Sequence, residues 1–168
     1  AFGMTEAVVV TMARDGDPAE LVASTCGRAI PGMETRILEP GEDGSGELLV
    51  RGEFVMLGYL DDPEATAEAI DEDGWLHTGD VGVLDGAGNL RITDRLKDMY
   101  ISGGFNVYPA EVERALLDHE AVVAAAVFGL PDPRLGQIGV AVVQLDPELA
   151  RSESQVIAEL GSQCADRL

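Results

Sequence analysis

Apolar residues in the first half of the chain come in short runs that are separated by turn residues. A glycine turn near the start is followed by the β-branched run 7–12, which predicts a loop that leads into a buried strand. Between residues 27 and 50, apolar runs alternate with two Pro-Gly pairs, a rhythm typical of a small antiparallel sheet or barrel. Gly46–Gly52, with the sequence GELLVRG, is predicted as one clear strand.

A short helix and a closing strand are expected next. Residues 63–70 are rich in alanine and predict a helix, for which Asp62-Pro63 supplies a cap and a first turn. A strand-like segment ends within residues 74–80, where a glycine predicts a tight turn. Residues 90–93 are predicted as the strand that closes this first part of the chain.

Beyond Lys97 the pattern changes from hairpins to mixed elements. Residues 99–102 predict a short strand that runs into Gly103-Gly104, and Pro109 stands where a helix can begin. That helix has Glu111 in its first turn, where a negative charge complements the helix dipole. An α+β second part is therefore expected.

The C-terminal third continues with two apolar strands and a helix. Residues 121–128 and 138–145 are predicted strands, and Ser152 and Gln155 form a capping-box pattern. An apolar stripe of the following helix is predicted at Ile157, Leu160, Cys164 and Leu168. We thus expect a mixed α/β fold with a barrel-like β subdomain over residues 1–96 and a small α+β domain over residues 97–168.

Charge and composition narrow the function. The chain has 168 residues, 46% of them hydrophobic, so it can bury a core, and its formal net charge is −20. Such a field repels nucleic acid, so nucleic-acid binding is not expected. An anion site would have to use Arg91, Arg95 and Lys97 together with backbone N–H groups and a metal ion.

The cysteines and the lack of a long apolar run indicate the compartment. Cys26 and Cys164 lie far apart and form no CxxC pair, which favours a reducing compartment. No run reaches the roughly 18 to 20 apolar residues of a membrane span, and we expect a cytoplasmic protein without a transmembrane segment. The sequence leaves a homo-oligomer open.

Three stretches carry candidate chemistry. In Asp94-Arg95-Leu96-Lys97-Asp98 four of five residues are charged, which places the stretch at a surface junction; a solvated turn between two strands is the alternative. Glu6, in Phe2-Gly3-Met4-Thr5-Glu6, could bind Mg²⁺ through its carboxylate, or could be a surface residue after a turn. Asp80, in Thr78-Gly79-Asp80, could accept hydrogen bonds from a ribose diol, or could cap its own backbone.

In their order along the chain these stretches resemble motifs of the AMP-forming acyl-CoA ligases of the adenylate-forming superfamily. The stretch around Glu6 resembles (Y/F)GxTE, the stretch around Asp80 resembles WxxTGD, and the stretch around Arg95 resembles the hinge motif. Gly46–Gly52 with Gly58-Tyr59 is similar to GELxVRGxxVxxGY, a structural segment of the family. Residues 127–137 resemble VxGxPDxxxGE, with Gln137 in place of the usual glutamate.

The resemblance implies a role for each matching residue. ATP or AMP would be bound by Gly3, Met4, Thr5, Asp80 and Arg95; Thr5, Glu6 and Arg95 would act in catalysis; Glu6 would hold Mg²⁺. Lys97 would be the hinge about which a C-terminal domain rotates, and Gly103 and Gly104 would meet the pantetheine of CoA. His77 and His119 receive no catalytic role.

The resemblance also implies an activity and a place in a larger enzyme. Residues 1–96 would be the C-terminal portion of a large adenylation domain, and residues 97–168 a mobile lid domain that is incomplete at its C-terminus. A carboxylic acid and ATP would give acyl-AMP, from which CoA would form a thioester. The segment GGFNVYPAEVE looks like that of fatty-acyl ligases, because Ile101 and Gly103 stand where aryl-acid relatives tend to place lysines.

Two pieces of such an enzyme are expected outside this chain. The phosphate loop would precede Ala1 and the adenylation lysine would follow Leu168, so the 168 residues are not expected to turn over alone. Two alternatives stay open: a non-catalytic lid or interaction module, and an adenylation domain that loads a carrier protein.

Overall fold

A computed structural model describes residues 1–148 and 152–167. The chain divides into two compact units, Ala1–Leu96 and Lys97–Leu168, each with its own hydrophobic core. Among the described residues no helix is both long and apolar enough to cross a membrane.

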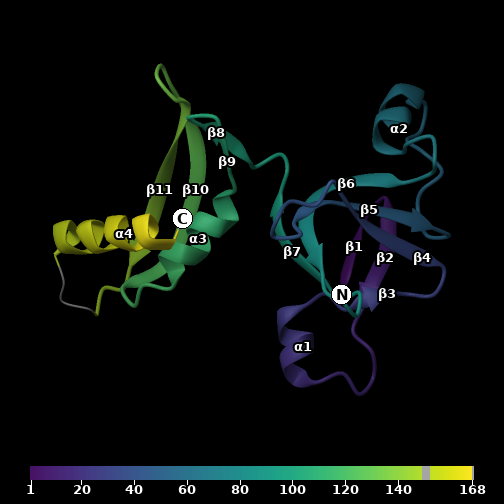
Figure 1. Ribbon diagram of the computed structural model, residues 1–168, viewed down its shortest axis with the longest axis horizontal. Helices are drawn as coiled ribbons and strands as arrows, with labels where there is room; N and C mark the ends of the chain where they lie inside the picture. Colours follow the sequence, from purple (N-terminus) through teal and green to yellow (C-terminus); the bar gives the residue numbers. More distant parts are fainter. Residues whose placement is uncertain (149–151, 168) are drawn as a thin grey trace. The chain divides into compact units, whose positions relative to one another are not determined.

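The first unit is built from two antiparallel sheets (Figure 1). The smaller sheet has the order β1-β2-β3, and the larger sheet follows the chain in the order β4-β5-β6-β7. Their bounds are β1 Phe2–Met4, β2 Ala7–Met12, β3 Arg28–Ala29, β4 Met33–Leu38, β5 Gly46–Gly52, β6 Leu76–Leu84 and β7 Leu90–Arg95.

The core of this unit joins both sheets. Val10 of β2 packs in one cluster with Leu48 and Val50 of β5, and all three are fully buried. Side chains alternate between the two faces of a strand, so Leu48 and Val50 share the core face. Burying each such side chain stabilises the unit by about 1.5–3 kcal/mol. The apolar pattern of GELLVRG thus explains why β5 is a central strand.

The expected barrel is not what the described strands form. They make open sheets of three and four strands, and β4 and β7 are the edges of the larger one. The glycine turn expected at the start is also wrong, because Gly3 lies inside β1, and Thr5 and Glu6 form the turn to β2. A side chain at Gly3 would collide with the Val8 backbone, so glycine is required there for close strand pairing.

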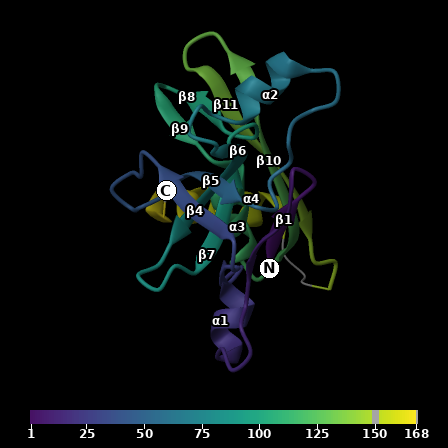
Figure 2. The ribbon, with the colours of Figure 1, turned by 90° about the vertical axis from the view of Figure 1, so that its right-hand side faces the viewer.

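Two short helices lie at opposite ends of the first unit in both views (Figures 1 and 2). Helix α2, Pro63–Ala69, matches the predicted helix, and its N-cap Asp62 accepts a hydrogen bond from the Ala65 N–H at 2.9 Å. Helix α1, Ala19–Ser24, was not expected from the sequence. It has no side-chain cap, which explains its weak signal.

Over its described residues, the second unit is a four-stranded antiparallel sheet with two helices. The strand order is β10-β11-β8-β9. The bounds are β8 Tyr100–Ser102, β9 Phe105–Val107, α3 Pro109–Leu117, β10 Val122–Asp132, β11 Gly136–Leu145 and α4 Glu153–Arg167.

The helices contribute to the core of the second unit. Leu116 of α3 and Val156 and Leu160 of α4 pack with strand residues in one buried cluster. The capping box is confirmed, since the Ser152 and Gln155 side chains bond reciprocally to each other's backbone N–H. Ile157 is 66% exposed, so the predicted stripe is wrong there, and Val156 takes its place. Leu168 lies outside the described residues.

The ring of Tyr100 packs over two glycines of neighbouring strands, in a slot that their missing side chains leave open. Gly129 of β10 and Gly139 of β11 are direct partners across the strand pair, and Tyr100 of β8 is 6% exposed. A Cβ atom on Gly129 would lie 2.6 Å from the Tyr100 Cβ, and one on Gly139 would overlap the Tyr100 hydroxyl. The missing side chains therefore make room for the ring that anchors β8.

Candidate nucleotide-binding site

The motif Thr78-Gly79-Asp80 forms a bulge within β6 and not the tight turn that the sequence predicts. On β5, Glu47 faces Val81 and Leu49 faces His77, so three residues of β6 stand opposite Leu48 alone. Gly79 has φ +70°, a left-handed conformation that glycine adopts without strain. The extra length turns the Asp80 side chain toward the end of β7.

Asp80 and Arg95 are brought together by the pairing of β6 with β7. The two residues are direct partners in the ladder, and Arg95 Nε donates to Asp80 Oδ1 at 2.9 Å. The Asp80 side chain is 8% exposed and that of Arg95 is 70% exposed. An oriented, buried acceptor thus lies beside a guanidinium that remains accessible to an anion.

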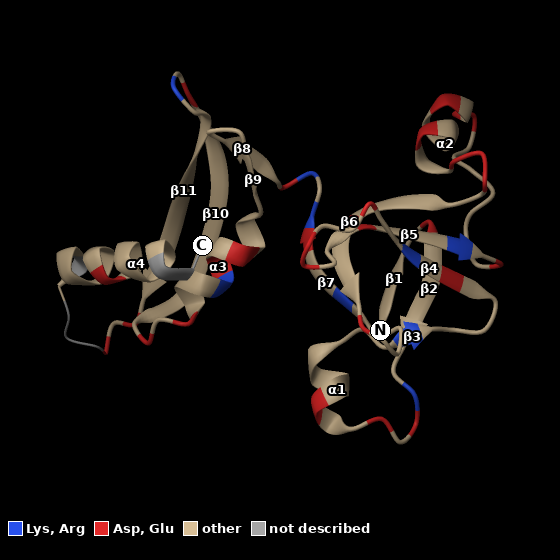
Figure 3. Ribbon diagram, viewed as in Figure 1, with Lys and Arg blue, Asp and Glu red and all other residues tan. Residues whose placement is uncertain are grey.

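Figure 3 shows how few cations accompany this pair. Lys and Arg residues, drawn in blue, appear at the end of β7 and in the segment that follows it. By sequence, Arg95 is the last residue of β7, and Lys97 lies two positions later. The whole chain has 31 acidic and 11 basic residues, which give a formal net charge of −20. An anion site at Arg95 would therefore have to act against the field of the whole chain.

The turn between β1 and β2 holds Thr5 and Glu6. Thr5 is exposed and Glu6 is partly buried. The Glu6 carbonyl accepts from the Met56 N–H at 2.7 Å, and the Tyr59 hydroxyl donates to Glu6 Oε1 at 3.0 Å. This hydrogen bond is the main reason why the pKa of Tyr59 is raised above its usual 10.0.

The fit of Glu6 to a hard cation can be judged from this contact. One carboxylate held from one side can still offer oxygen to a metal, as Mg²⁺ sites built from one or two carboxylates and phosphates require. Among the described residues no group of three or more His, Cys, Asp or Glu side chains is placed to hold a metal ion. A site at Glu6 is thus compatible only with a metal that shares its ligands with a phosphate.

The remaining predicted residues belong to the second unit. Lys97 is its first residue and is exposed. Gly103 and Gly104 form the turn of the β8–β9 hairpin, with φ values of +59° and +91°. Two successive positive φ values favour glycine and match the twist of a hairpin. This turn belongs to the second unit, whereas Asp80 belongs to the first.

Two family models match the chain. One, described as "AMP-binding enzyme", matches residues 1–60, and the other, described as "AMP-binding enzyme C-terminal domain", matches residues 111–168. The chain belongs to the AMP-binding enzyme family. The family membership expected from the motifs is confirmed.

Three relatives of this chain illustrate the likeness. The chain is 60% identical over 168 residues to a 3-[(3aS,4S,7aS)-7a-methyl-1,5-dioxo-octahydro-1H-inden-4-yl]propanoyl:CoA ligase of Rhodococcus jostii, covering 100% of the chain and 31% of the relative. ATP-bound MatB of Rhodopseudomonas palustris matches with TM-score 0.84 and 37% identity over 96% of the chain and 33% of MatB.

The third relative is a solved complex with a reaction intermediate. The o-succinylbenzoate CoA synthetase of Bacillus subtilis in complex with an acyl-adenylate matches with TM-score 0.78 and 35% identity, over 99% of the chain and 34% of the synthetase. The chain therefore spans about a third of the length of each of these relatives.

Two residues that were not selected from the sequence contact the site. Tyr59 reaches Glu6, and Glu47 of β5 contacts the bulge of β6 through Gly79 and His77. Each contact joins segments that are far apart in the sequence and depends on strand register. Glu47 is the first charged residue of GELLVRG. Because side chains alternate between the two faces of a strand, the sequence could have indicated that Glu47 lies on the face opposite the core residues Leu48 and Val50.

A second charged cluster on the same strands has a structural explanation. Arg51 pairs with Glu34 on the neighbouring strand β4, with 2.9 Å between Nη2 and Oε2. The guanidinium groups of Arg36 and Arg51 lie 4.4 Å and 4.5 Å from the centroid of the Trp75 ring. These contacts cover a tryptophan that is 7% exposed. Arg51 therefore pairs with a carboxylate and covers Trp75 at the same time.

Proposed function

We propose that the protein containing this chain is an ATP-dependent acyl-CoA ligase, and that this chain supplies its ribose-binding carboxylate, its hinge and its CoA-facing turn. The observation that carries the proposal is the buried Asp80 carboxylate held against an exposed Arg95 by a glycine bulge. Family membership and the ligase names of the relatives support the reaction class.

The proposed reaction has two steps. In the first, a carboxylate oxygen of the acid forms a bond to the α-phosphorus of ATP, and pyrophosphate leaves. In the second, the thiol of CoA loses its proton and forms a bond to the acyl carbon, and AMP leaves. Both steps shift charge on phosphate oxygens, so fixed positive groups that are in place beforehand lower the barrier.

The residues of the first unit would hold the nucleotide. Asp80 can accept from the ribose hydroxyls because its carboxylate is an acceptor only and is already oriented by Arg95. The exposed guanidinium of Arg95 has further N–H groups to offer to the ribose and phosphate. Thr5 would contact the phosphate and the substrate carboxylate, and Gly3 and Met4 would line the approach of the nucleotide.

Glu6 fits the role of metal ligand. Its Oε1 accepts from Tyr59, which fixes the carboxylate without adding a competing cation. Mg²⁺, when bound there, would shield the phosphate charge. Tyr59 then acts by orienting Glu6, and no direct contact of Tyr59 with substrate is required.

Residues 97–168 would form the mobile domain of the enzyme, and Lys97 its pivot. The division of the chain after Leu96 supports a pivot at this position. Rotation would exchange an adenylation face for a thioester-forming face, so that a single cleft serves both steps. The exposed turn Gly103-Gly104 lacks side chains, which leaves room for the thin pantetheine arm of CoA.

The acid is the least constrained part of the proposal. A relative that is 60% identical is named for a propanoyl group on a methyl-dioxo-octahydroindene ring system, and such a fused-ring propanoate is the first acid to test. A fatty acid, expected from the motif around Gly103-Gly104, is the second.

The test is a panel of acids offered to the full-length protein with ATP and CoA. AMP release and the acyl-CoA product are measured together for fused-ring propanoates, fatty acids of several lengths and aryl acids. We expect AMP and thioester in equal amounts with one acid class. Acyl-AMP without thioester would instead favour an adenylation domain that loads a carrier protein, and no AMP with any acid would favour a non-catalytic module.

A further inference from the structure

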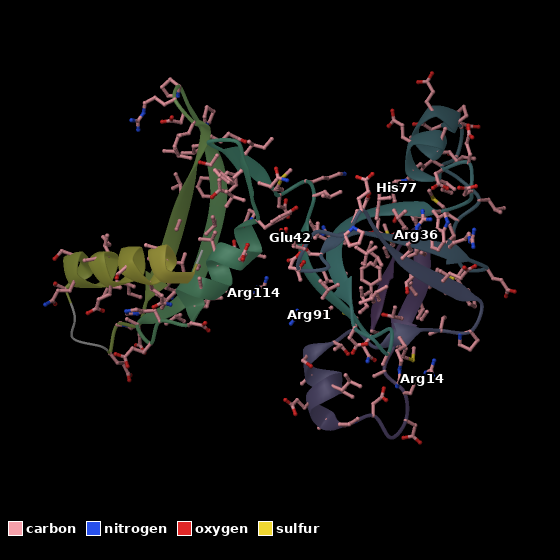
Figure 4. The ribbon with its side chains drawn as sticks, viewed as in Figure 1. Arg14, Arg36, Glu42, His77, Arg91 and Arg114 are labelled. Carbon is pink, nitrogen blue, oxygen red and sulfur yellow. The ribbon has the colours of Figure 1, made fainter. Side chains whose placement is uncertain are left out.

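Glu47 is a mostly buried carboxylate whose two oxygens both have partners. Its side chain is 13% exposed. Oε1 accepts from the Gly79 N–H at 3.1 Å, and Oε2 lies 2.9 Å from His77 Nδ1. A buried carboxylate is costly unless it is hydrogen-bonded, so both contacts are needed to keep it in place. Figure 4 shows His77 projecting from β6.

The contact with Gly79 replaces a ladder hydrogen bond that the bulge removes. Three residues of β6 stand opposite Leu48, so the regular pairing of β5 with β6 is interrupted between Leu49 and Glu47. The Thr78 hydroxyl closes one side of the bulge by donating to the Leu48 carbonyl at 2.7 Å. Glu47 closes the other side and satisfies the N–H of the partly buried Gly79.

The same peptide segment carries the proposed nucleotide contacts. The Gly79 carbonyl accepts from the Leu96 N–H at 2.8 Å, one residue before the second unit begins. Asp80 follows directly and binds Arg95. A shift of Gly79 therefore moves both the aspartate and the end of β7 that bears the arginine.

We propose that Glu47 is a positioning residue for nucleotide binding: it clamps Gly79 and so holds Asp80 and Arg95 in the orientation that accepts a ribose and phosphate. This inference rests on the proposed function, because it assumes that Asp80 and Arg95 bind the nucleotide. Glu47 itself touches no substrate. Its effect travels through one hydrogen bond to one backbone N–H.

His77 completes the clamp. An ionised carboxylate only accepts hydrogen bonds, so Nδ1 of His77 carries the proton and donates to Glu47. A glutamine at position 47 can keep both contacts, because its amide oxygen can accept from Gly79 and its NH₂ group can donate to the other tautomer of His77. Alanine at position 47 can keep neither. The two substitutions therefore separate the clamp from the charge.

The test measures AMP binding by calorimetry in the full-length protein and in Glu47→Ala, Glu47→Gln and Glu34→Ala. Glu34 is the control, because its carboxylate also bonds to a side chain of a neighbouring strand, Arg51 of β5 at 2.9 Å, and it does not touch the bulge. We expect about a tenfold weaker affinity for AMP in Glu47→Ala, the effect of one lost hydrogen bond to a charged group. Glu47→Gln is expected within about threefold of the parent, and Glu34→Ala likewise.

Hydrogen exchange of the Gly79 amide is the second readout, since a general loss of stability would not single out this group. We expect faster exchange at Gly79 in Glu47→Ala and unchanged exchange in Glu34→Ala. Equal AMP affinity of parent and Glu47→Ala, or an equal loss in Glu34→Ala, overturns the clamp. Failure of Glu47→Gln to restore AMP affinity, or unchanged Gly79 exchange in Glu47→Ala, overturns it as well.

The proposed function fails in a different way. If the parent binds AMP but forms no acyl-AMP with any acid, the proposed ligase function is wrong. The role of Glu47 is then still decided by the AMP affinities of the variants. A parent that binds no AMP contradicts both.

Discussion

Tyr59 donates its hydroxyl to the Glu6 carboxylate across 53 residues of sequence, with 3.0 Å between Tyr59 Oη and Glu6 Oε1. The backbone reinforces the contact, since the Met56 N–H donates to the Glu6 carbonyl and Ala7 pairs with Val55. The turn that bears the proposed metal ligand is thus held by the segment after β5. The segment that ends in Gly58-Tyr59 thus has a specific contact with the turn that bears Glu6.

The first prediction concerns the titration of Tyr59. The hydrogen bond to Glu6, followed by burial and the negative charge of Glu6, raises the pKa of Tyr59 above 10.0. Because the folded-state pKa lies above the unfolded one, the contribution to stability is complete below pH 10 and is lost as pH rises through the raised pKa. As pH rises above 10, the free energy of unfolding in urea should therefore fall more for the parent than for Tyr59→Phe.

Tyr108→Phe, which removes a phenol hydroxyl from the second unit, is the control for the loss of one hydroxyl group. Identical pH dependence of the parent and Tyr59→Phe would mean that the contact with Glu6 contributes nothing to stability.

The second prediction concerns the Tyr100 slot. Gly139→Ala would place a methyl group against the Tyr100 hydroxyl, and such overpacking costs about 1–3 kcal/mol. Gly161→Ala in α4 is the control, because nothing lies within 4 Å of its added Cβ. There alanine should stabilise the helix by about 0.5–1 kcal/mol. Chemical denaturation of both variants measures the two changes.

Opposite signs for the two glycine variants are the expected result. A Gly139→Ala protein as stable as the parent would show that the Tyr100 ring moves aside without cost, and that the slot does not fix β8.

Local signals explain which elements the sequence predicted well. The strand Gly46–Gly52 and the helix that starts after Asp62 follow from an apolar run and a cap, and the structure reproduces both. The capping box of Ser152 and Gln155 is equally local. In each case the responsible residues lie within a few positions of one another, so no knowledge of the fold was needed.

Long-range pairing explains what the sequence could not predict. The bulge at Gly79 depends on the side chain of Glu47, 32 residues away, and a glycine-aspartate pair alone is typical of a turn. Whether hairpins close into a barrel depends on strand tilt and register, which composition does not encode. In α4 the adjacent apolar residues Val156 and Ile157 differ only in which face packing selects.

The third prediction concerns Lys97 as a pivot. Proline fixes φ and removes the N–H, so Lys97→Pro should block rotation while Lys97→Ala removes only the cation. In the full-length protein we expect Lys97→Pro to keep acyl-AMP formation and to lose thioester formation by about tenfold or more, as a change of 1.4 kcal/mol would produce. Pyrophosphate exchange and acyl-CoA formation follow the two steps separately.

Lys97→Ala should retain thioester formation better than Lys97→Pro. Equal loss of both steps in Lys97→Pro, with the fold intact by circular dichroism, would make Lys97 an ordinary site residue. No loss in either step would place the pivot elsewhere.

The central claim is that Asp80 and Arg95 form the ribose side of an ATP site. Asp80→Ala in the full-length protein removes a charged acceptor worth about 1.5–3 kcal/mol, so the KM for ATP should rise about tenfold to a hundredfold. The KM for the acid should change little. Asp17→Ala is the matched control, because it breaks another Asp–Arg pair of the same unit, the one with Arg28.

Acid-dependent exchange of pyrophosphate into ATP, measured over a range of ATP concentrations, is the most direct measurement. We expect exchange by the parent and by Asp17→Ala at similar ATP concentrations, and a selective shift to higher ATP concentration in Asp80→Ala. A KM for ATP within about twofold of the parent in Asp80→Ala, well below the effect of one hydrogen bond to a charged group, would contradict it.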